Sequence, residues 1–389
     1  MENLKKYKCF IVCCIMVFIH TGINSVATAV MPQLKIYYGV ELSTIISGAA
    51  ACSIMMFIGG FIGAKFIRKV KPKGAFAVSS LFAALYAFLI FITDKVWGFY
   101  VGCAAVGLTA AWGGYATSNI YINKLYEKKA GVLIASLITV GSLGSATFQF
   151  ISGRLLTVIG LRGVYLCLIF VALFAIVVNY LFLTNIDVDE NKGNKTAVEN
   201  DNAIFKERKF IKMTIVTLFG GTLCGTFGTL CTTFFQSHGI DTAVSATYLS
   251  FYTLSCGLLA MIAGAIADKF GYKTYVTYLF VAYLSAISLA IVYDKFEINA
   301  ILPAMIIAFG LASSFGSIYN MLSKPIFMEK SLVANTKLMS VGSFGSAVLL
   351  PTYTKIYEMC GFSTLWILLM IISFICFYLV LSVLKESKL

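Results

Sequence analysis

Hydrophobic residues run along this chain in long stretches that are separated by short polar ones. Val164–Leu183 and Phe362–Val383 contain no charged side chain. Each is about as long as the twenty-residue α-helix that crosses a hydrocarbon core roughly 30 Å thick. The stretches are continuously apolar and do not alternate with a period of two, so the pattern argues against a transmembrane β-barrel. It predicts an all-α membrane protein.

Twelve such stretches are predicted to be transmembrane helices. They lie at residues 9–31, 42–66, 74–92, 96–122, 131–153, 163–183, 210–235, 243–267, 275–293, 300–321, 332–353 and 362–384. An even number puts both termini on one side of the membrane. The segments on that side hold 24 Lys and Arg residues, against six on the other. Because cytoplasmic loops are enriched in these residues, both termini are predicted to be cytoplasmic, in a multi-pass protein of the cell membrane.

The longest polar stretch divides the predicted helices into six plus six. Residues 185–209 are polar, charged and poor in aromatic side chains, which is typical of a linker. The chain is therefore predicted to consist of an N-terminal bundle (1–184), this cytoplasmic linker and a C-terminal bundle (210–389).

The two predicted bundles share a sequence repeat. "GSLGSA" at 141–146 returns as "GSFGSA" at 342–347, an offset of 201 residues, and the similarity extends without a gap on both sides. Further pairs align at offsets of 204 and 200, at 60–69 with 264–273 and at 39–41 with 239–241. Such duplicated units are typical of transporters whose halves rock around a central site. We expect Gly141, Gly144, Gly342 and Gly345 to allow close approach on the moving surface between the halves.

Composition and charge narrow the class of function. Hydrophobic residues make up 59% and charged residues 12% of the chain, whereas a soluble protein has about a quarter charged residues. The net charge of +13 comes from lysines clustered between apolar stretches, which indicates membrane topology and not nucleic-acid binding. The eleven cysteines lack metal-ligand spacing. No nucleophile–base constellation is present either, so we expect neither an enzyme nor a bound cofactor.

The segment "GAIADKFGYK" (264–273) is similar to the cytoplasmic signature of the major facilitator superfamily. The resemblance implies twelve helices in two pseudo-symmetric bundles and alternating access. It also implies a conformational role for Gly264, which permits close packing, and for Asp268 with Lys269, which can pair or cap a helix. The first-half copy has Ala64 where the second half has Asp268.

The stretch "NKLYEKKAGVLIASLITVGSLGSATFQFISGRLLTVIGLRGVY" resembles a narrower branch, the oxalate–formate antiporters and related monocarboxylate transporters. The resemblance rests on Tyr126, Lys128, Lys129 and the glycines that follow them. It implies exchange of small organic anions. The chain lacks the helix 8 arginine and the deep helix 11 lysine of that branch, so dicarboxylate chemistry does not carry over.

Charged side chains near the centres of the predicted spans are rare. No acidic residue lies at mid-span, which argues against a carboxylate proton relay. His20 is the one ionisable group near the centre of a span, and Asn24 lies one turn further along the same face. Two interpretations stay open for His20: a neutral ring bonded to a neighbouring helix, or a solute-binding or proton-carrying group.

Three stripes of polar residues recur at helical spacing. They are Trp112, Tyr115 and Asn119, then Ser313, Gly316 and Asn320, and finally Thr222, Thr226 and Thr229. The superfamily resemblance implies that helices 1, 4, 7 and 10 line the cavity, so together these stripes are interpreted as an uncharged solute-binding surface. Individually, each residue could instead form hydrogen bonds between helices.

Arg154 and Lys355 occupy equivalent positions in the repeat. They can extend toward lipid headgroups, or attract an anion at the outer mouth of a cavity. With the resemblance, they favour a carrier or exchanger of a small organic anion. We expect it to be a monomer embedded in the lipid bilayer. The alternatives are a carrier of a neutral or amphipathic solute, including an efflux carrier, and a membrane sensor that moves no solute.

Overall fold

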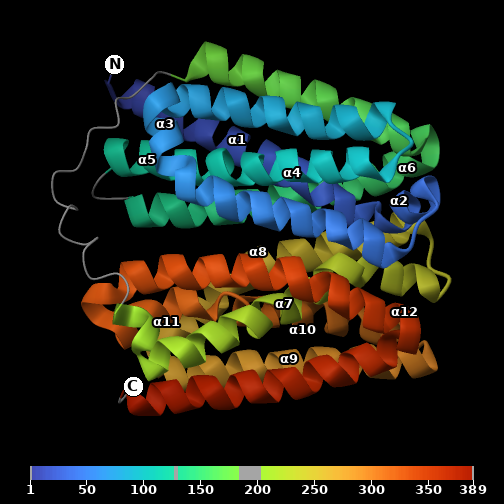
Figure 1. The fold of residues 1–389 in the computed structure, drawn as a ribbon, viewed down its shortest axis with the longest axis vertical. Coiled ribbons are helices and arrows are strands. Elements are labelled where there is room, and N and C mark those ends of the chain that lie inside the picture. The colour runs from blue at the N-terminus through green and yellow to red at the C-terminus, as the bar shows by residue number, and fades with distance from the viewer. Residues whose placement is uncertain (1, 127–129, 184–202, 388–389) are drawn as a thin grey trace. The chain divides into compact units, whose positions relative to one another are not determined.

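The long apolar segments fold into α-helices in this computed structural model, which describes residues 2–126, 130–183 and 203–387. Every element in these ranges is helical (Figure 1). The first six helices are α1 (Glu2–Ala29), α2 (Met31–Tyr38), α3 (Leu42–Ile92), α4 (Val96–Trp112), α5 (Gly114–Leu125) and α6 (Ala130–Phe182). The later elements are η2 (Ala203–Lys206), α7 (Arg208–Ser237), α8 (Thr242–Phe270), α9 (Tyr272–Phe296), η3 (Asn299–Ile301), α10 (Leu302–Ala312), η4 (Ser313–Phe315), α11 (Ile318–Phe327), η5 (Met328–Lys330) and α12 (Ser331–Glu386).

Three of these helices contain a residue with non-helical backbone angles. Lys71 in α3, Gly160 in α6 and Gly361 in α12 have φ of 59°, 69° and 81°. Gly160 and Gly361 are partners in the 201-residue repeat, and glycine adopts positive φ without a steric penalty. Figure 1 shows α12 as two stretches that run in opposite directions. The repeat therefore places an equivalent turn inside α6 and inside α12.

The number of membrane crossings follows from these turns. Ten helical segments in the described part of the chain are long and apolar enough to span a membrane, and two of them contain 47 and 50 residues. At a rise of 1.5 Å per residue each of these two measures about 70 Å or more, over twice the thickness of the hydrocarbon core. Since each of them turns once, each makes two crossings. The total of twelve agrees with the prediction from the sequence.

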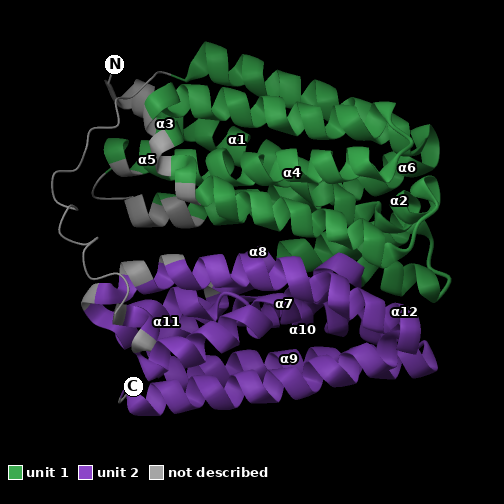
Figure 2. Cartoon of the chain, viewed as in Figure 1, with its two compact units in different colours: residues 1–189, 231–254 green, residues 190–230, 255–389 purple. Residues whose placement is uncertain are grey.

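The chain divides into two compact units (Figure 2). Unit 1 comprises residues 1–189 and 231–254, and unit 2 comprises residues 190–230 and 255–389. The chain thus changes unit inside α7, between Leu230 and Cys231, and again inside α8, between Leu254 and Ser255. The predicted bundle limits at 185–209 stay a prediction.

Unit 1 is packed around aromatic side chains between α3, α4 and α6. Trp112 stacks on Phe66 with ring centroids 4.1 Å apart, and its Nε1 donates a hydrogen bond to the Gly59 carbonyl oxygen at 2.9 Å. The buried hydroxyls of Tyr86 and Tyr165 lie 3.1 Å apart. These aromatic groups satisfy their polar atoms within the unit, as a membrane interior requires.

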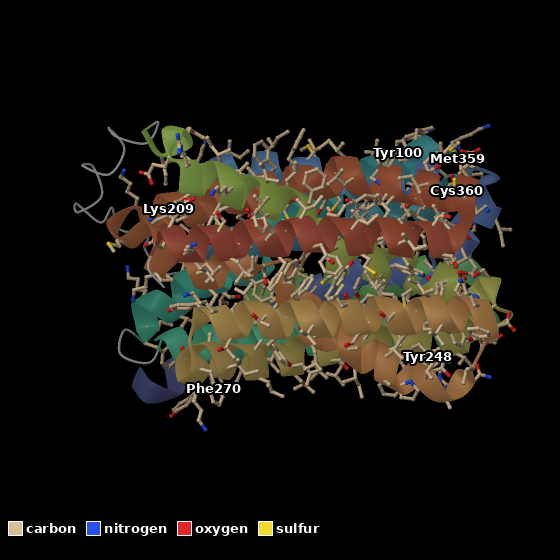
Figure 3. All side chains as sticks on the ribbon, turned by 90° about the horizontal axis from the view of Figure 1, so that it is seen from below. Tyr100, Lys209, Tyr248, Phe270, Met359 and Cys360 are labelled. Atoms are coloured by element: carbon tan, nitrogen blue, oxygen red, sulfur yellow. The ribbon has the colours of Figure 1, made fainter. Side chains whose placement is uncertain are left out.

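Unit 2 has an equally aromatic interior. Phe227 of α7 stacks on Phe309 of α10 at 3.8 Å, and Phe280 of α9 stacks on Phe377 of α12 at 4.0 Å. Trp366 is fully buried beside the first pair. In Figure 3, Lys209 and Phe270 lie toward one end of this unit's helices, and Met359 and Cys360 lie toward the other.

The glycines of the repeated hexapeptide pack inside each unit. A Cβ on Gly144 would lie 2.3 Å from the carbonyl oxygen of Phe18 in α1, and a Cβ on Gly345 would lie 2.5 Å from that of Leu218 in α7. Gly141 faces the hydroxyl of Tyr115, and Gly342 lies 3.3 Å from the Thr217 methyl by the same measure. The expectation that these four glycines lie on a moving surface between the halves stays a prediction. They permit close helix crossing within a unit.

Candidate functional site: polar positions inside the helix bundles

The fourth predicted span is broken in its interior. α4 ends at Trp112 and α5 begins at Gly114, with Gly113 extended (ψ −163°) and Gly114 at a φ of +51°. A break frees backbone groups that water would satisfy outside a membrane. Here side chains satisfy them: the Thr117 hydroxyl donates to the Trp112 carbonyl oxygen, and the Gly114 N–H donates to Nδ1 of His20 at 3.2 Å.

His20 is enclosed by this break. Its side chain is 3% exposed, and Nε2 lies 2.9 Å from the Ser80 hydroxyl. Because Nδ1 accepts the Gly114 N–H, the ring proton must be on Nε2, which donates to Ser80. Both ring nitrogens are thus bonded to protein. Of the two interpretations left open by the sequence, the geometry favours the neutral ring that joins neighbouring helices.

The predicted stripe of Trp112, Tyr115 and Asn119 does not share one face. Trp112 belongs to α4, is 7% exposed and donates to a carbonyl oxygen of α3, and its part in binding a solute stays a prediction. Tyr115 and Asn119 belong to α5 and are half-buried. Asn119 Oδ1 is buried without a hydrogen-bond partner among the described residues. The break, which the sequence reading missed, is marked by the adjacent glycines 113 and 114.

Asn24 is an exposed polar residue near the C-terminal end of α1. Gly22, Ile23 and Val26 around it are buried, while Asn24 is exposed and its Oδ1 accepts a weak hydrogen bond from the Cys52 thiol at 3.9 Å. An exposed amide among apolar residues is costly beside lipid, so its side chain is expected to face a hydrated space.

The tenth predicted span, in unit 2, is also interrupted. In the sequence repeat, this interruption lies at the position equivalent to the break in the fourth span. α10, η4 and α11 follow one another where the first half has α4 and α5. The Cys224 thiol donates to the Ala312 carbonyl oxygen at 3.2 Å. Ser313 is half-buried next to this interruption, and Asn320 on α11 is exposed. Asn320 is the repeat partner of Asn119, so in both halves an amide lies within the first two turns of the helix that follows the break.

The threonine stripe on α7 mostly faces the interior of its unit. Thr222 and Thr226 are at most 1% exposed, and each donates to a carbonyl oxygen of its own helix at 2.7 Å, Phe219 and Thr222 respectively. Both hydroxyls are therefore bonded within α7, and their part in binding a solute stays a prediction. Gly225 is the open position instead, since a Cβ there would meet no atom within 4 Å.

The paired cations are exposed. The Arg154 guanidinium lies 4.7 Å from the centre of the Phe150 ring on the preceding turn of α6. Lys355 Nζ lies 3.7 Å from a carboxylate oxygen of Glu358. Each cation thus has a neighbour on its own helix.

Gly264, Asp268 and Lys269, for which a conformational role was predicted, lie in the last turns of α8. Gly264 faces the Met321 methyl, which a Cβ would approach to 3.7 Å. Asp268 is exposed and forms no ion pair within the described ranges, and Lys269 lies 5.3 Å from the Phe270 ring centre. Lys128 and Lys129, which carried the branch resemblance, lie outside the described residues.

Comparison of the sequence with known families gives one clear match. The profile of the Major Facilitator Superfamily matches residues 13–326, well over half of the chain. The chain belongs to this superfamily. It is accordingly a membrane transporter and not an enzyme. No curated protein sequence matches it significantly.

Solved structures agree on the fold of this major facilitator transporter. A variant of the nucleoside transporter NupG gives a TM-score of 0.80 at 14% identity, over 96% of this chain and 99% of that one. A second structure of the nucleoside transporter NupG gives a TM-score of 0.76 at 15% identity, over 98% of this chain and 99% of that one. A D-xylose–proton symporter gives 0.75 at 13% identity, over 98% of each chain. At such low identity these likenesses show the fold alone, and they single out no branch such as the oxalate–formate antiporters.

The major facilitator transporter also has a polar cluster that the sequence reading missed. The Tyr37 hydroxyl donates to an Asp94 carboxylate oxygen at 2.5 Å, Arg162 Nε donates to the Tyr37 hydroxyl at 2.8 Å, and a second guanidinium nitrogen of Arg162 pairs with Asp94. The hydrogen bonds from Tyr37 and Arg162 lower the pKa of Asp94 below its ordinary value of 3.8. This cluster ties α2 to the α3–α4 connection and to α6 where α6 turns.

The second feature missed is the α7–α8 hairpin, residues 231–254, which belongs to unit 1. Four polar residues join it to α1 and α6, and we call them the Gln149 network: Thr28, Gln149, Thr232 and Thr253. Gln149 Oε1 accepts from the Thr253 hydroxyl at 2.8 Å, and its Nε2 donates to the Thr28 hydroxyl at 3.3 Å. The Thr232 hydroxyl donates to the Thr28 carbonyl oxygen at 2.9 Å.

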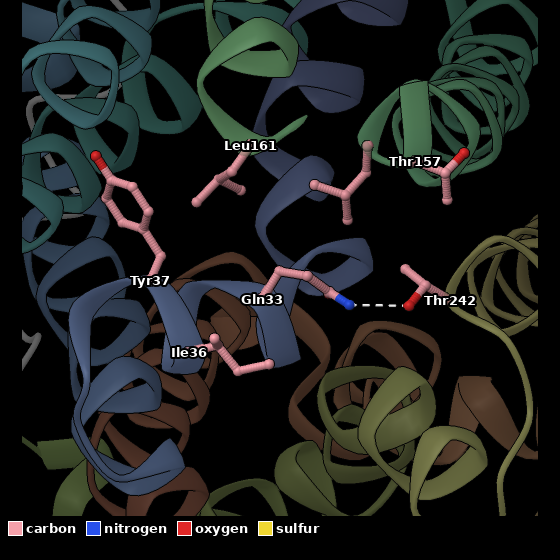
Figure 4. A pocket seen from close by; sticks show the side chains of 7 residues that line it. Gln33, Ile36, Tyr37, Thr157, Leu161 and Thr242 are labelled. Atoms are coloured by element: carbon pink, nitrogen blue, oxygen red, sulfur yellow. Dashed lines mark hydrogen bonds between the residues drawn. The ribbon is translucent and has the colours of Figure 1, made fainter. Parts of the chain in front are cut away.

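A cavity of about 330 Å³ lies at the end of the same hairpin (Figure 4). It is lined by Gln33, Ile36, Tyr37, Leu156, Thr157, Leu161 and Thr242. Gln33 Nε2 donates to the Thr242 hydroxyl at 2.9 Å, and Gln33 Oε1 is buried without a partner among the described residues. The cavity has the size of the smallest ligand pockets, about 300 Å³.

Proposed function

We propose that this transporter moves a small, neutral, hydrogen-bonding solute by alternating access. The observation that carries the proposal is the character of the exposed polar side chains inside the spans. Asn24 on α1 and Asn320 on α11 are amides, and Gly225 on α7 leaves space for a ligand. Amides both donate and accept hydrogen bonds, which suits hydroxyl-bearing or amide-bearing solutes.

The charge distribution supports a neutral solute. A carboxylate in an apolar interior needs a compensating cation, because burying an unpaired charge is costly. The ring nitrogens of His20 are both bonded to protein, and Arg154 and Lys355 are exposed residues with neighbours on their own helices. The described span interiors therefore offer amides and hydroxyls where an anion would need a positive charge.

The names of the structural neighbours are compatible with this class. A nucleoside transporter and a D-xylose symporter have names that specify neutral solutes rich in hydroxyl groups. Since their identity to this chain is 13–15%, they support the class of solute and do not identify it.

An organic anion is the second candidate, and two observations favour it. Arg154 and Lys355 are symmetric cations, and the broken fourth and tenth spans each begin a new helix inside the bundle, at Gly114 and Ile318. The positive end of a helix dipole at such a break can bind an anionic group. The pairing of Lys355 with Glu358 weighs against this candidate.

The mode of transport follows from the acidic residues. Since the sequence places no carboxylate at mid-span, we propose facilitated diffusion or exchange in place of carboxylate-coupled proton transport. We further propose that both termini lie in the cytoplasm, on the basis of the 24 Lys and Arg residues on that side against six on the other. We also propose that the transporter is a monomer in the cell membrane.

A thermal-shift screen of the purified protein tests the proposal, because a ligand that binds the native state raises Tm, and the rise grows with the ligand concentration relative to its dissociation constant. The panel contains nucleosides, pentoses and monocarboxylates, each over a concentration series. We expect stabilisation by a neutral solute, lost in Asn24→Ala and Asn320→Ala and kept in the control Thr147→Val, whose exposed hydroxyl bonds only to its own helix. Stabilisation by carboxylates alone, lost when Arg154 and Lys355 are both changed to Gln, would overturn the neutral-solute proposal in favour of the second candidate.

A further inference from the structure

The α7–α8 hairpin is the part of the second sequence half that belongs to unit 1. Both points where the chain changes unit lie two residues from a member of the Gln149 network: Thr232 follows Leu230, and Thr253 precedes Ser255. Alternating access requires the two units to move relative to one another. Either α7 and α8 then bend at these two points, or the hairpin separates from α1 and α6. The Gln149 network lies close to both points, so its hydrogen bonds are affected in either case.

We propose that Gln149 is a positioning residue that holds the α7–α8 hairpin on α1 and α6, and that transport requires its hydrogen bonds to be exchanged. This inference rests on the proposed alternating access. Gln149 is 4% exposed, and its amide is the one group that reaches both α1 and α8 in the network. If the hairpin moved away, both ends of the amide would lose a partner inside the bundle until water or a solute replaced it.

Close packing around Gln149 supports this role. One turn further along α6, a Cβ on Gly153 would lie 2.2 Å from the Cβ of Ala246 in α8. Ala246 is fully buried. The small residues bring α6 and α8 near enough for the Gln149 and Thr253 side chains to meet at 2.8 Å. The hydrogen bond and the glycine contact thus lie on one face of α6.

The sequence repeat shows that the residues of this contact between α6 and α8 occur in the first half only. At the offset of 201 residues, Gln149 corresponds to Leu350 and Gly153 corresponds to Thr354. Neither the amide nor the glycine recurs, although the hexapeptide just before them does. The second half therefore lacks the residues that make this contact in the first half.

Amide hydrogen exchange of the full-length protein in detergent tests the proposal without any solute. We expect Gln149→Leu and Thr253→Val each to speed exchange in peptides from residues 231–254, by roughly fivefold to thirtyfold, because local opening becomes easier. Peptides from α9 should exchange as in the wild type. Thr247→Val is the matched control: it lies on the same helix and its hydroxyl bonds only to the Ala243 carbonyl oxygen at 2.8 Å.

The two variants should also be non-additive. Since Gln149 and Thr253 bond to one another, Thr253→Val in the Gln149→Leu background should add little further exchange, whereas a general loss of stability would add fully. The proposal is overturned if Thr253→Val matches Thr247→Val, or if the double variant is additive. If Gln149→Leu does not fold, the comparison of Thr253→Val with Thr247→Val decides alone. A solute screen that fails leaves this measurement intact, so the two proposals fail separately.

Discussion

Gly153 of α6 faces Ala246 of α8 so closely that a Cβ on the glycine would lie 2.2 Å from the alanine Cβ. Gly153→Ala should therefore force the two helices apart and lower the free energy of unfolding by about 1–3 kcal/mol, the usual cost of overpacking. Gly60→Ala is the control, because a Cβ at Gly60 meets no atom within 4 Å. Thermal unfolding of both variants measures the difference. Equal melting temperatures would contradict the described approach of α6 and α8.

Replacement of His20 should destabilise the break between α4 and α5. His20→Ala leaves the Gly114 N–H without its acceptor, and an unsatisfied buried donor costs about 1–3 kcal/mol. Ser80→Ala also leaves one buried donor, Nε2–H, without its acceptor, but it keeps the packing of the ring, whereas His20→Ala also leaves a cavity; Ser80→Ala should therefore cost less. Denaturation curves of the two variants give the order. If Ser80→Ala were the more harmful, the assignment of the Nδ1 bond as the important one would be wrong.

Gly144 and Gly345, the second glycines of the two repeated hexapeptides, should respond alike to substitution. Gly144→Ala and Gly345→Ala each bring a Cβ to within 2.5 Å or less of a backbone carbonyl oxygen, and backbone cannot move aside as a side chain can. We expect each to lower Tm by several degrees, as about 1–3 kcal/mol of overpacking does. Gly264→Ala, which meets only the flexible Met321 methyl at 3.7 Å, should be close to neutral. A strong effect at Gly264 with none at Gly144 would count against the packing described here.

The cluster of Tyr37, Asp94 and Arg162 should respond to acid and not to base. The pKa of Asp94 is lowered in the folded protein, first by the Tyr37 hydrogen bond and then by that of Arg162. A lowered carboxyl pKa contributes stability above the ordinary value of 3.8, and the contribution is lost as the pH falls through the folded value. The Tm difference between wild type and Asp94→Asn should thus be constant from about pH 5 to pH 8 and vanish in stronger acid. A difference that changes between pH 6 and pH 8 would exclude Asp94 as its source.

The sequence predicted the helices well because their signal is long-range and simple. The twelve apolar stretches and the two halves of the repeat follow from hydropathy and from residues that recur at a fixed offset. The superfamily was recognised from a ten-residue signature, and the family comparison confirmed it.

The polar site was predicted less well, because helical spacing assumes an unbroken helix. Trp112 and Asn119 share a face only if the helix continues through Gly113, and it does not. Thr222 and Thr226 read as cavity-lining hydroxyls, but a threonine can donate to its own helix and be buried, as both are. Spacing alone cannot distinguish these outcomes.

Because the α7–α8 hairpin packs within unit 1, it affects what happens when the protein is expressed as two separate fragments. A cut between codons 190 and 203 would separate two polypeptides, yet the second would still carry residues 231–254, which pack with helices of the first. The hairpin would then act as a built-in recognition element between the fragments. Co-expressed fragments should assemble in the membrane without a covalent connection, so the protein can be handled as a complementing pair whose association reports directly on the α7–α8 hairpin.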